Sequence, residues 1–300
     1  MNKIKDTNKS QIISIIIPTY NRGMLIAEAI KSVINQTYAN WELIIVDDGS
    51  TDDTEHIVSQ FIKKDDRISY VKRPDSKPKG ANACRNYGLE LSKGDFIKWL
   101  DSDDFLNENC LQRQLNEIQK DGEVFANFCY AQFFNVEGDS LQHLDKLWCE
   151  KLTTTKITED LIKAKLKWPI LSGLWRRSVF KDDPFNEALK NSQEWLFNIG
   201  MSLLPGFKMN VTECRLAYIR THSDSMSSKV NSNGKYYFYA ALGRYFALEL
   251  VAAYKLPKDL KLVLLRRFFW YQAFSLIKKF PQGFLKLIQY WPRVLYLFLK

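Results

Sequence analysis

The chain has 300 residues, of which 46% are hydrophobic and 26% are charged. This composition is typical of a folded globular protein and excludes the collagen-like and low-complexity classes. The five cysteines include no C-x-x-C pair, which argues against a disulfide framework and a zinc knuckle. We therefore expect buried, reduced thiols in a cytoplasmic protein.

The net charge of +9 is concentrated near the C-terminal end. Residues 260–300 contain eight basic side chains, no acidic one and eleven aromatic residues. The longest uncharged run in this segment, 268–277, has ten residues, whereas a spanning helix needs about 20. We therefore expect a segment that lies on a membrane surface without crossing the bilayer. The alternative is that these aromatic residues pack against the rest of the chain or against a second subunit.

The first hundred residues alternate short apolar runs with amphipathic stretches, which is typical of a parallel α/β sheet. This pattern predicts strands at 12–17, 41–46, 68–72 and 96–100, and helices at 25–34, 50–62 and 81–91. Ser50 and Asp53 are predicted to cap the second of these helices. Three strands end in polar or acidic turns, and ligands of open α/β sheets bind beyond the carboxyl ends of the strands. These turns are therefore the candidate site.

The pattern is weaker beyond residue 107. It predicts a helix to about 120, a strand from 124, helices at 192–204, 235–255 and 260–279, and a strand at 214–220. No element is predicted in the polar stretch that ends near 167. Pro281, Gly283 and Pro292 predict that the chain beyond 279 forms short helical pieces.

The turn Asp101-Ser102-Asp103-Asp104 follows the strand predicted at 96–100. Three carboxylates in four residues repel one another unless a cation or strong donors lie among them. The cluster therefore favours a hard divalent ion such as Mg²⁺ or Mn²⁺, which usually bridges to phosphate oxygens. An acidic turn that caps the following helix would have the same sequence.

Two other turns carry groups suited to a nucleotide. Pro18, Tyr20 and Asn21 offer an aromatic face and an amide to a base, while Asp47 and Asp48 form a second acidic turn, which could equally cap a helix. Lys79 and Arg85 lie around the start of the helix predicted at 81–91. Basic side chains and free N–H groups there could hold a diphosphate, although a solvated helix face is the alternative.

Four motifs, in this order and spacing, resemble those of the family 2 glycosyltransferases: SIIIPTYNR at 14–22, ELIIVDDGSTDDT at 42–54, GANACRNYGL at 80–89 and WLDSDD at 99–104. The resemblance implies the GT-A fold, a Rossmann-like and mostly parallel α/β sheet flanked by helices, here with a helical, basic and aromatic C-terminal extension. It also implies an inverting transferase that takes a sugar from a nucleotide-diphosphate donor, most commonly a UDP-sugar, with Mn²⁺ or Mg²⁺.

The resemblance also implies roles for individual residues. Tyr20 matches the family tyrosine that stacks on the base, and Asp48 matches the aspartate that reads uracil. Asp103 is expected to touch the metal, and Asp101 to lie near the ribose or a metal-bound water. The other residues expected around the donor are Pro18, Asn21, Asp47, Lys79, Arg85 and Ser102.

The second half of the chain carries fainter matches. Phe185-Asn186-Glu187 and Gln193-Glu194-Trp195 resemble the family pattern F-D-E, spacer, E-D-W, in which the later aspartate is the catalytic base. Glu194 occupies that position with one extra methylene, and Glu187 is the alternative base. His222 lies in a region similar to the family's Y-x-R-x-H and is a further candidate metal ligand. Trp175 is a candidate platform for the acceptor sugar, or a core residue.

The expected organisation is a flexible N-terminus at 1–11, a transferase domain at 12–228 and a helical extension at 229–300. Within the domain, 12–104 forms the nucleotide-binding half and 105–228 the acceptor half. No apolar stretch precedes residue 12, so no signal peptide is expected. We expect a glycan or lipid-linked acceptor and peripheral attachment to the anionic cytoplasmic face of a membrane.

Two alternatives stay open. A nucleotide-sugar-binding protein without turnover is one, because Gln193 and Glu194 replace the family's acid pair. A nucleic-acid-binding protein is the other, because cations and stacking rings also bind single strands. The apolar content of the C-terminal segment argues against nucleic acid as a partner.

Overall fold

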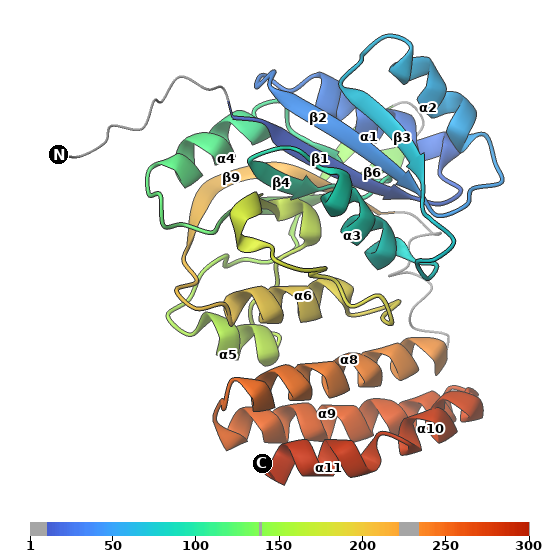
Figure 1. Ribbon diagram of the computed structural model, residues 1–300, viewed down its shortest axis with the longest axis vertical. Coiled ribbons are helices and arrows are strands. Elements are labelled where there is room, and N and C mark those ends of the chain that lie inside the picture. The colour runs from blue at the N-terminus through green and yellow to red at the C-terminus, as the bar shows by residue number, and fades with distance from the viewer. Residues whose placement is uncertain (1–10, 138–139, 222–233, 300) are drawn as a thin grey trace. The chain divides into compact units, whose positions relative to one another are not determined.

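A computed structural model describes residues 11–137, 140–221 and 234–299 (Figure 1). The elements up to the middle of the chain are β1 Ile13–Thr19, α1 Gly23–Ile34, β2 Trp41–Asp47, α2 Thr54–Ile62, β3 Ile68–Lys72, α3 Ala81–Leu91, β4 Phe96–Trp99, β5 Phe105–Leu106, α4 Cys110–Gln119 and β6 Ala126–Glu137. The later elements are β7 Ser140–Leu147, α5 Ile157–Ile162, β8 Gly173–Arg176, α6 Gln193–Ser202, β9 Met209–Arg220, α8 Gly234–Ala253, α9 Lys258–Ile277, α10 Pro281–Ile288 and α11 Trp291–Leu299. Two short 3₁₀ helices, 170–172 and 177–179, flank β8.

The strands form one mixed sheet in the order β3-β2-β1-β4-β8-β6-β9-β5, with β7 paired to β6. The strands β3, β2, β1 and β4 are parallel, and β4 pairs with β8 in antiparallel orientation. From β1 the chain moves outward through β2 to β3 and then returns to place β4 on the other side of β1. Because such crossovers are right-handed, α1 and α2 share one face of the sheet and α3 covers the other (Figure 1).

Strand β1 is buried along its whole length, as expected of a parallel strand covered on both faces. Its run of isoleucines forms the centre of the core together with the apolar residues of β2. Helix α3 approaches β1 closely at Gly88, where an added Cβ would lie 2.4 Å from Cγ2 of Ile16. A glycine is therefore required there for α3 to pack against the sheet.

Lys98 lies in the otherwise apolar strand β4 and is fully buried. The sequence around it does not indicate which groups would bind its charge. Its Nζ donates to Oε1 of Gln114 at 2.7 Å and to the carbonyl of Leu171 at 2.8 Å. A second carbonyl, that of Gly173, lies 3.5 Å away. This ammonium group therefore ties β4 and α4 to the segment that leads into β8.

The described chain forms two compact units, and the backbone passes between them several times. The first unit consists of the residues up to Cys129 together with Ile170–Asp182 and Lys208–Tyr218. The second unit consists of Tyr130–Pro169, Asp183–Phe207 and the chain from Ile219 onward. The boundaries predicted from the sequence, at 12–104, 105–228 and 229–300, stay predictions, and the first ten residues of the predicted flexible N-terminus lie outside the described residues.

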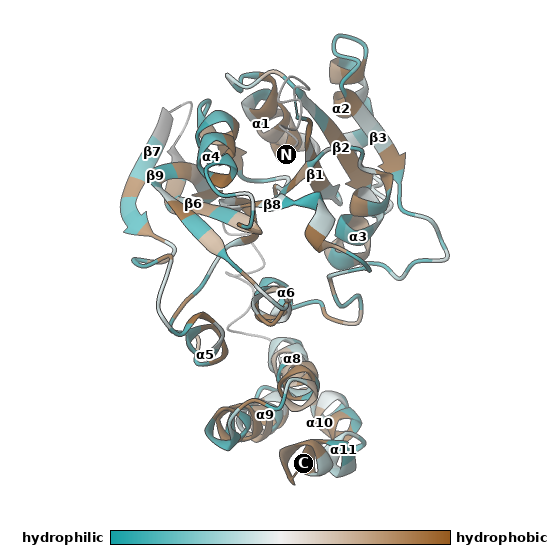
Figure 2. Ribbon diagram, turned by 60° about the vertical axis from the view of Figure 1, so that its left-hand side comes forward, coloured by the Kyte–Doolittle hydropathy of each residue, from teal (hydrophilic) through white to brown (hydrophobic). Residues whose placement is uncertain are grey.

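Helices α8 to α11 lie side by side in the second unit (Figure 1). Pro257 lies directly before α9. The helices α10 and α11 are short and begin at Pro281 and Trp291, as predicted from the proline positions. Apolar residues lie on outward as well as inward faces of these helices (Figure 2). Within the described ranges, no helix has the length and the hydropathy that would let it cross a bilayer.

Candidate nucleotide-sugar site

The turns after β1 and β2 are joined by hydrogen bonds at the carboxyl end of the parallel sheet. The backbone N–H of Asp48 donates to the carbonyl of Thr19 at 2.9 Å. Asn21, which has a φ of 51°, accepts from the N–H of Thr51 through its side chain at 2.8 Å, and its own N–H donates to the Ser50 hydroxyl. These contacts fix the backbone that presents Tyr20, whose side chain is 50% exposed and therefore available for stacking.

Asp52 connects the starts of two helices. Its carboxylate accepts the N–H of Gly23, the first residue of α1, at 3.0 Å, and the N–H of Thr54, the first residue of α2, at 3.1 Å. Burial opposes the charged form, but a hydrogen bond from the Thr54 hydroxyl, together with these backbone hydrogen bonds, lowers the pKa of Asp52 below its ordinary value of 3.8. The prediction that Ser50 caps α2 is wrong, because α2 begins at Thr54 and the Ser50 hydroxyl instead donates to Asp47.

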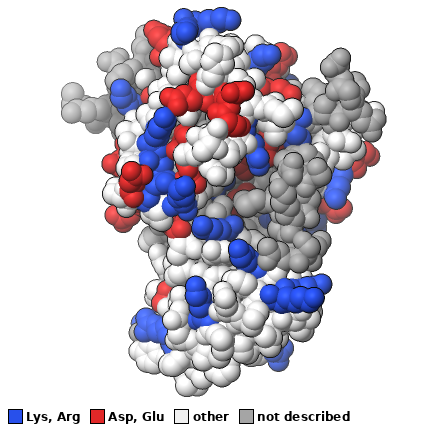
Figure 3. All heavy atoms as spheres, turned by 90° about the vertical axis from the view of Figure 1, so that its right-hand side faces the viewer, with Lys and Arg blue, Asp and Glu red and all other residues white. Residues whose placement is uncertain are grey.

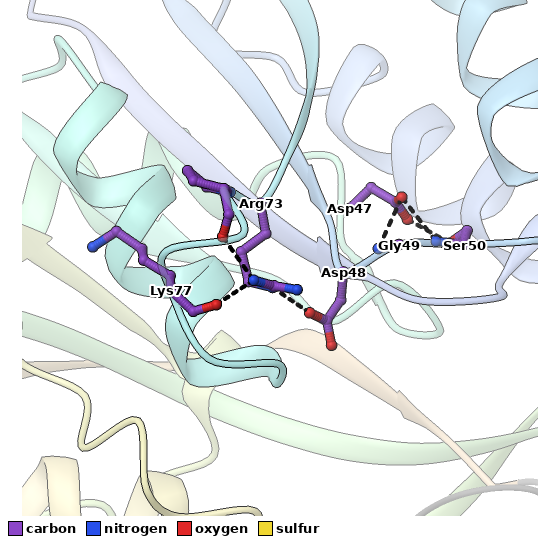
Figure 4. A network of polar contacts seen from close by, with 7 residues as sticks. Asp47, Asp48, Gly49, Ser50, Arg73 and Lys77 are labelled. Carbon is purple, nitrogen blue, oxygen red and sulfur yellow. Dashed lines mark hydrogen bonds and ion pairs between the residues drawn. The ribbon is translucent and has the colours of Figure 1, made fainter.

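Asp47 stabilises its own turn. Its carboxylate is buried and accepts the N–H groups of Gly49 and Ser50 at 3.1 and 2.9 Å, as well as the Ser50 hydroxyl (Figure 4). The structure therefore corrects its predicted role, since its oxygens are used within the turn rather than offered to a ligand. Pro18 and Ser102 are likewise buried, so their contribution is to the shape of the turns.

Asp48 is held by Arg73, a residue that the sequence analysis did not select. The Arg73 Nε donates to Oδ1 of Asp48 at 2.6 Å, and its Nη1 donates to the carbonyls of Pro74, at 2.7 Å, and Lys77 (Figure 4). The Arg73 side chain is 5% exposed and that of Asp48 is 14% exposed. The guanidinium group thus fixes the orientation of the carboxylate and shapes the loop that leads to Lys79. The sequence signal was an arginine directly after β3.

The acidic turn after β4 is paired with arginines from two other elements. Arg85 of α3 donates from Nη2 to Oδ1 of Asp101 at 2.7 Å, and Nη2 of Arg22 lies 3.7 Å from Oδ2 of Asp103. Because Arg85 is buried and committed to Asp101, the structure corrects its predicted role from a phosphate contact to a positioning residue. Lys79 is exposed and forms no ion pair with any residue in the described ranges, so it stays available to a phosphate.

The three turns meet at the switch point of the sheet, between β1 and β4, where successive strands change from one side of β1 to the other. This is the ligand-binding position of open α/β folds. On the face at the carboxyl ends of the parallel strands, Figure 3 shows acidic and basic side chains gathered next to one another. Burial beneath this site, with the nearby Asp48 charge, raises the pKa of the Cys84 thiol to about 12. That thiol is therefore neutral and belongs to the core.

The carboxylates of Asp101 and Asp103 are oxygen donors of the kind that Mg²⁺ and Mn²⁺ prefer. Both side chains keep access to solvent, at 30% and 21% exposed. No cluster of three or more His, Cys, Asp or Glu able to hold a metal occurs in the part of the chain that the structure describes. This donor set fits a metal held by one or two carboxylates and by the phosphates of a ligand, rather than by a closed protein cage.

Glu194 lies in the first turn of α6, within the second unit, and lines a cavity of about 660 Å³. Its neighbour Gln193 is buried and donates to the carbonyl of Leu189 at 2.9 Å, so the residue that replaces the family acid is structural. Glu187 is partly exposed and does not line this cavity. His222 lies outside the described residues.

The prediction that Trp175 offers a face to the acceptor is corrected by its burial. Its side chain is 1% exposed and packs edge-on against Phe128, with ring centroids 5.4 Å apart, and near Phe180. The ring therefore has no free face for a sugar. The alternative interpretation, a core tryptophan, holds for Trp175.

A family model described as "Glycosyl transferase family 2" matches residues 14–187. The chain belongs to this family. It is 32% identical over 185 residues to the GalNAc(5)-diNAcBac-PP-undecaprenol beta-1,3-glucosyltransferase of Campylobacter jejuni, a match that covers 62% of this chain and 58% of that one. The chain spans less than two thirds of the length of this and other curated relatives that it matches, for example 30% and 51% of two of them.

Solved structures share the fold. Staphylococcus aureus TarS 1–349 with UDP-GlcNAc is 18% identical, with a TM-score of 0.59 over 92% of this family 2 chain and 91% of that one. Mannosyltransferase PcManGT of Pyrobaculum calidifontis, with GDP-Man and Mn²⁺, is 15% identical, with a TM-score of 0.55 over 93% and 74%. The predicted α/β GT-A architecture with C-terminal helices is confirmed.

Proposed function

We propose that this family 2 protein is an inverting glycosyltransferase that moves a sugar from a nucleotide diphosphate, a UDP-sugar, to a polysaccharide or lipid-linked glycan. The observation that carries the proposal is the meeting of Tyr20, the Asp48–Arg73 pair and the Asp101–Asp103 turn at one edge of the sheet. The Campylobacter relative is named for a lipid-linked substrate and the TarS structure contains UDP-GlcNAc, which supports these choices.

Each donor group has a partner of matching chemistry. The exposed ring of Tyr20 stacks on the base, and the Asp48 carboxylate, held by Arg73, accepts the N–H of uracil. Asp101, oriented by Arg85, accepts a ribose hydroxyl, and Lys79 binds a phosphate. The two arginines stay bound to carboxylates, so the site is formed before the donor arrives.

Asp103, with Asp101, would hold Mn²⁺ or Mg²⁺ together with the donor phosphates. A bound divalent ion neutralises charge on the departing diphosphate, an effect worth several kcal/mol. Arg22 lies 3.7 Å from Asp103 and keeps that carboxylate in place on the protein side. His222 stays a proposed further ligand, outside the described residues.

Glu194 is the proposed base. It takes the proton from the acceptor hydroxyl as that oxygen attacks the anomeric carbon, a contribution of about 10² to 10⁴ in rate. One displacement breaks the bond to the diphosphate and inverts the anomeric centre, so no covalent enzyme intermediate is needed. Glu187 is the alternative base, and the cavity lined by Glu194 favours Glu194.

The test is a thermal-shift and transfer panel of UDP- and GDP-sugars with and without Mn²⁺. A true donor at 100 times its dissociation constant stabilises the fold by about 2.7 kcal/mol. Asp103→Asn should abolish transfer and remove the Mn²⁺ effect on donor binding, whereas Asp66→Asn, an exposed carboxylate outside the site, should change neither. Full activity in excess chelator would refute the metal assignment.

Glu194→Gln keeps the shape of the side chain but cannot accept a proton. Turnover should therefore fall steeply while the affinity for the donor stays nearly constant. Unchanged turnover would exclude Glu194, and Glu187→Gln would then be tested as the base. Donor binding without transfer by the unmodified chain would favour the non-catalytic alternative, and tight binding of single-stranded RNA at moderate salt would favour the nucleic-acid alternative.

We further propose peripheral attachment to the anionic cytoplasmic face of a membrane through α9, α10 and α11. Five of the eight basic residues of 260–300 are exposed, whereas Lys261 is buried, Arg267 donates to two carbonyls near α5, and Lys300 lies outside the described residues. On α9 the exposed Arg266, Trp270 and Ile277 share one helical face.

The electrostatic contribution follows from these five charges. At about 1 kcal/mol for each basic residue near an anionic surface, the upper bound is about 5 kcal/mol before screening. Exposed apolar side chains add interfacial burial: Trp270, Leu276, Ile277, Leu285, Trp291, Leu295, Tyr296 and Leu299.

Vesicle sedimentation tests the attachment. Lys278→Glu with Lys279→Glu should release the chain from phosphatidylserine vesicles, and Lys63→Glu with Lys64→Glu, an exposed lysine pair outside 260–300, should not. Truncation is a poor test, because α9 buries Leu264 and Phe268. Equal binding to neutral and anionic vesicles would contradict the electrostatic part of the proposal.

A further inference from the structure

The cavity that Glu194 lines has an excess of basic residues, which the proposed role of Glu194 as a base does not explain. Its volume of about 660 Å³ is in the range of small-molecule sites. The residues that line it come from the second unit, including the α8 and α9 helices. Among the described lining residues, four are basic and Glu194 alone is acidic; the basic ones are Lys167, Lys190, Lys235 and Arg244.

Arg244 of α8 carries a buried cation in this cavity. Arg244 is only 7% exposed. Its Nη1 donates to the Ser192 hydroxyl at 3.0 Å and lies 3.4 Å from the carbonyl of Ala240. The guanidinium carbon lies 4.1 Å from the ring centroid of Trp195 and 4.8 Å from that of Tyr271. The buried Nε makes no hydrogen bond to any described residue.

The contacts of Arg244 leave its charge without a counter-charge. Among the described residues, no carboxylate forms an ion pair with it, in contrast to Arg73 and Arg85 of the first unit. Burial lowers the pKa of the Arg244 guanidinium below its usual value, yet arginine stays charged at neutral pH. Two aromatic faces and one hydroxyl offset part of the desolvation cost of a buried cation. An anion in the cavity would supply the missing partner.

The aromatic lining adds a preference for a sugar beside that anion. Trp148, Trp168 and Trp195 line the cavity together with Tyr236, Tyr239 and Tyr271. Such rings cover the apolar faces of carbohydrates, and the tyrosine hydroxyls can bind sugar hydroxyl groups. The Nε1 atoms of Trp168 and Trp195 already donate to the carbonyls of Leu152 and Leu161. Glu194 lines the same cavity, so a sugar bound there has an acceptor for a hydroxyl proton.

We infer that this cavity is the acceptor site and that it takes a glycosyl phosphate or glycosyl diphosphate, with Arg244 binding a phosphate oxygen and the aromatic rings contacting the sugar. The name acceptor for the bound sugar phosphate rests on the proposed transferase function, whereas its binding in the cavity does not. Planar guanidinium groups bind phosphate oxygens through their N–H donors, and Arg244 lines the cavity with its buried Nε unpaired among the described residues. The lysines Lys190 and Lys235 are exposed and add positive potential at the opening.

The test uses the full chain and the fluorescence of the tryptophans that line the cavity, a readout independent of turnover. The probes are GlcNAc 1-phosphate, GlcNAc and farnesyl diphosphate. GlcNAc 1-phosphate should bind at least about 10-fold more tightly than GlcNAc, because hydrogen bonds to charged groups are the strong ones. Arg244→Gln should weaken its binding by about 10- to 100-fold, and Lys258→Gln, an exposed cation outside the cavity, should not.

If Arg244→Gln does not fold, Lys190→Gln with Lys235→Gln decides, with an expected loss of several-fold. Equal binding of GlcNAc and GlcNAc 1-phosphate, or unchanged binding in the folded variants, would overturn the inference. Competition between farnesyl diphosphate and GlcNAc 1-phosphate supports it with a lipid-linked source, and the absence of competition supports it with a soluble sugar phosphate.

UDP-sugar binding, measured in parallel, separates the two proposals. If a UDP-sugar binds and GlcNAc 1-phosphate does not, the cavity assignment fails and the proposed function stands. If GlcNAc 1-phosphate binds and no nucleotide sugar does, the proposed function fails and the phosphate site stands.

Discussion

The pairing of Arg73 with Asp48 gives a prediction that links stability to donor binding. Arg73→Met removes a cation that is 5% exposed and leaves the Asp48 carboxylate, 14% exposed, without its partner. Loss of one member of a buried ion pair costs about 3–5 kcal/mol, and the residual solvent access of Asp48 places this case near the lower end. The carbonyls of Pro74 and Lys77 lose a donor as well.

Lys72→Met is the matched control, since it removes a cation one residue away. Lys72 pairs with Glu55 at 2.9 Å, but both side chains are more than half exposed, so the loss of stability should be much smaller than for Arg73→Met. Urea denaturation measures both variants, and calorimetric titration with UDP measures donor affinity. We expect Arg73→Met to weaken UDP by about 10-fold or more through the misplaced Asp48. Equal destabilisation by the two variants, or unchanged UDP affinity in Arg73→Met, would refute the reasoning.

Three further predictions concern the first unit. Gly88→Ala should lower the free energy of unfolding by about 1–3 kcal/mol, measured in urea, because its Cβ would meet Ile16 of β1 at 2.4 Å; an unchanged midpoint would contradict the close packing of α3. Lys98→Ala should cost more than about 3 kcal/mol by the same measurement, because Gln114 and two carbonyls lose a buried donor. The lowered pKa of Asp52 stabilises the fold fully above its ordinary value of 3.8 and less as the pH falls through the folded value, so Asp52→Asn should flatten the acid limb of the stability curve; an identical limb would count against it.

The parallel half of the fold was predictable because its signals are local. The buried runs of β1 and β2 and the amphipathic spacing of α1 and α3 each lie within a short window, so the helix at 81–91 was predicted at the bounds that the structure shows. The antiparallel half was not predictable in the same way. The strands β5 and β8 have two and four residues, and β7 is polar, so only pairing with distant strands makes them strands.

The candidate site shows the same division. Asp48 stands directly after β2, and Asp101 and Asp103 lie in the turn that follows β4, so their motif positions were enough to select them as candidates. The partners that orient these carboxylates are set by side-chain reach across the sheet. The sequence showed that Arg85 was close to the site, but not that it would be buried against Asp101, and the position of Arg73 directly after β3 did not reveal its partner. Trp175 illustrates the reverse error, since a motif position says nothing about burial.

The interleaving of the two units along the chain has a consequence for recombination between relatives. Neither unit is one continuous stretch, so a single crossover within 130–218 would join halves of both units from different parents. The stretch from Ile219 onward is the exception, because it belongs wholly to one unit and supplies α8 and α9, with Arg244 and Tyr271, to the cavity wall. Exchange of this terminal stretch would alter one wall of that cavity, while the residues of the first unit that are proposed to bind the donor stayed as inherited. Exchange of this one stretch would therefore change the proposed acceptor cavity, whereas the proposed donor-binding residues of the first unit would be kept.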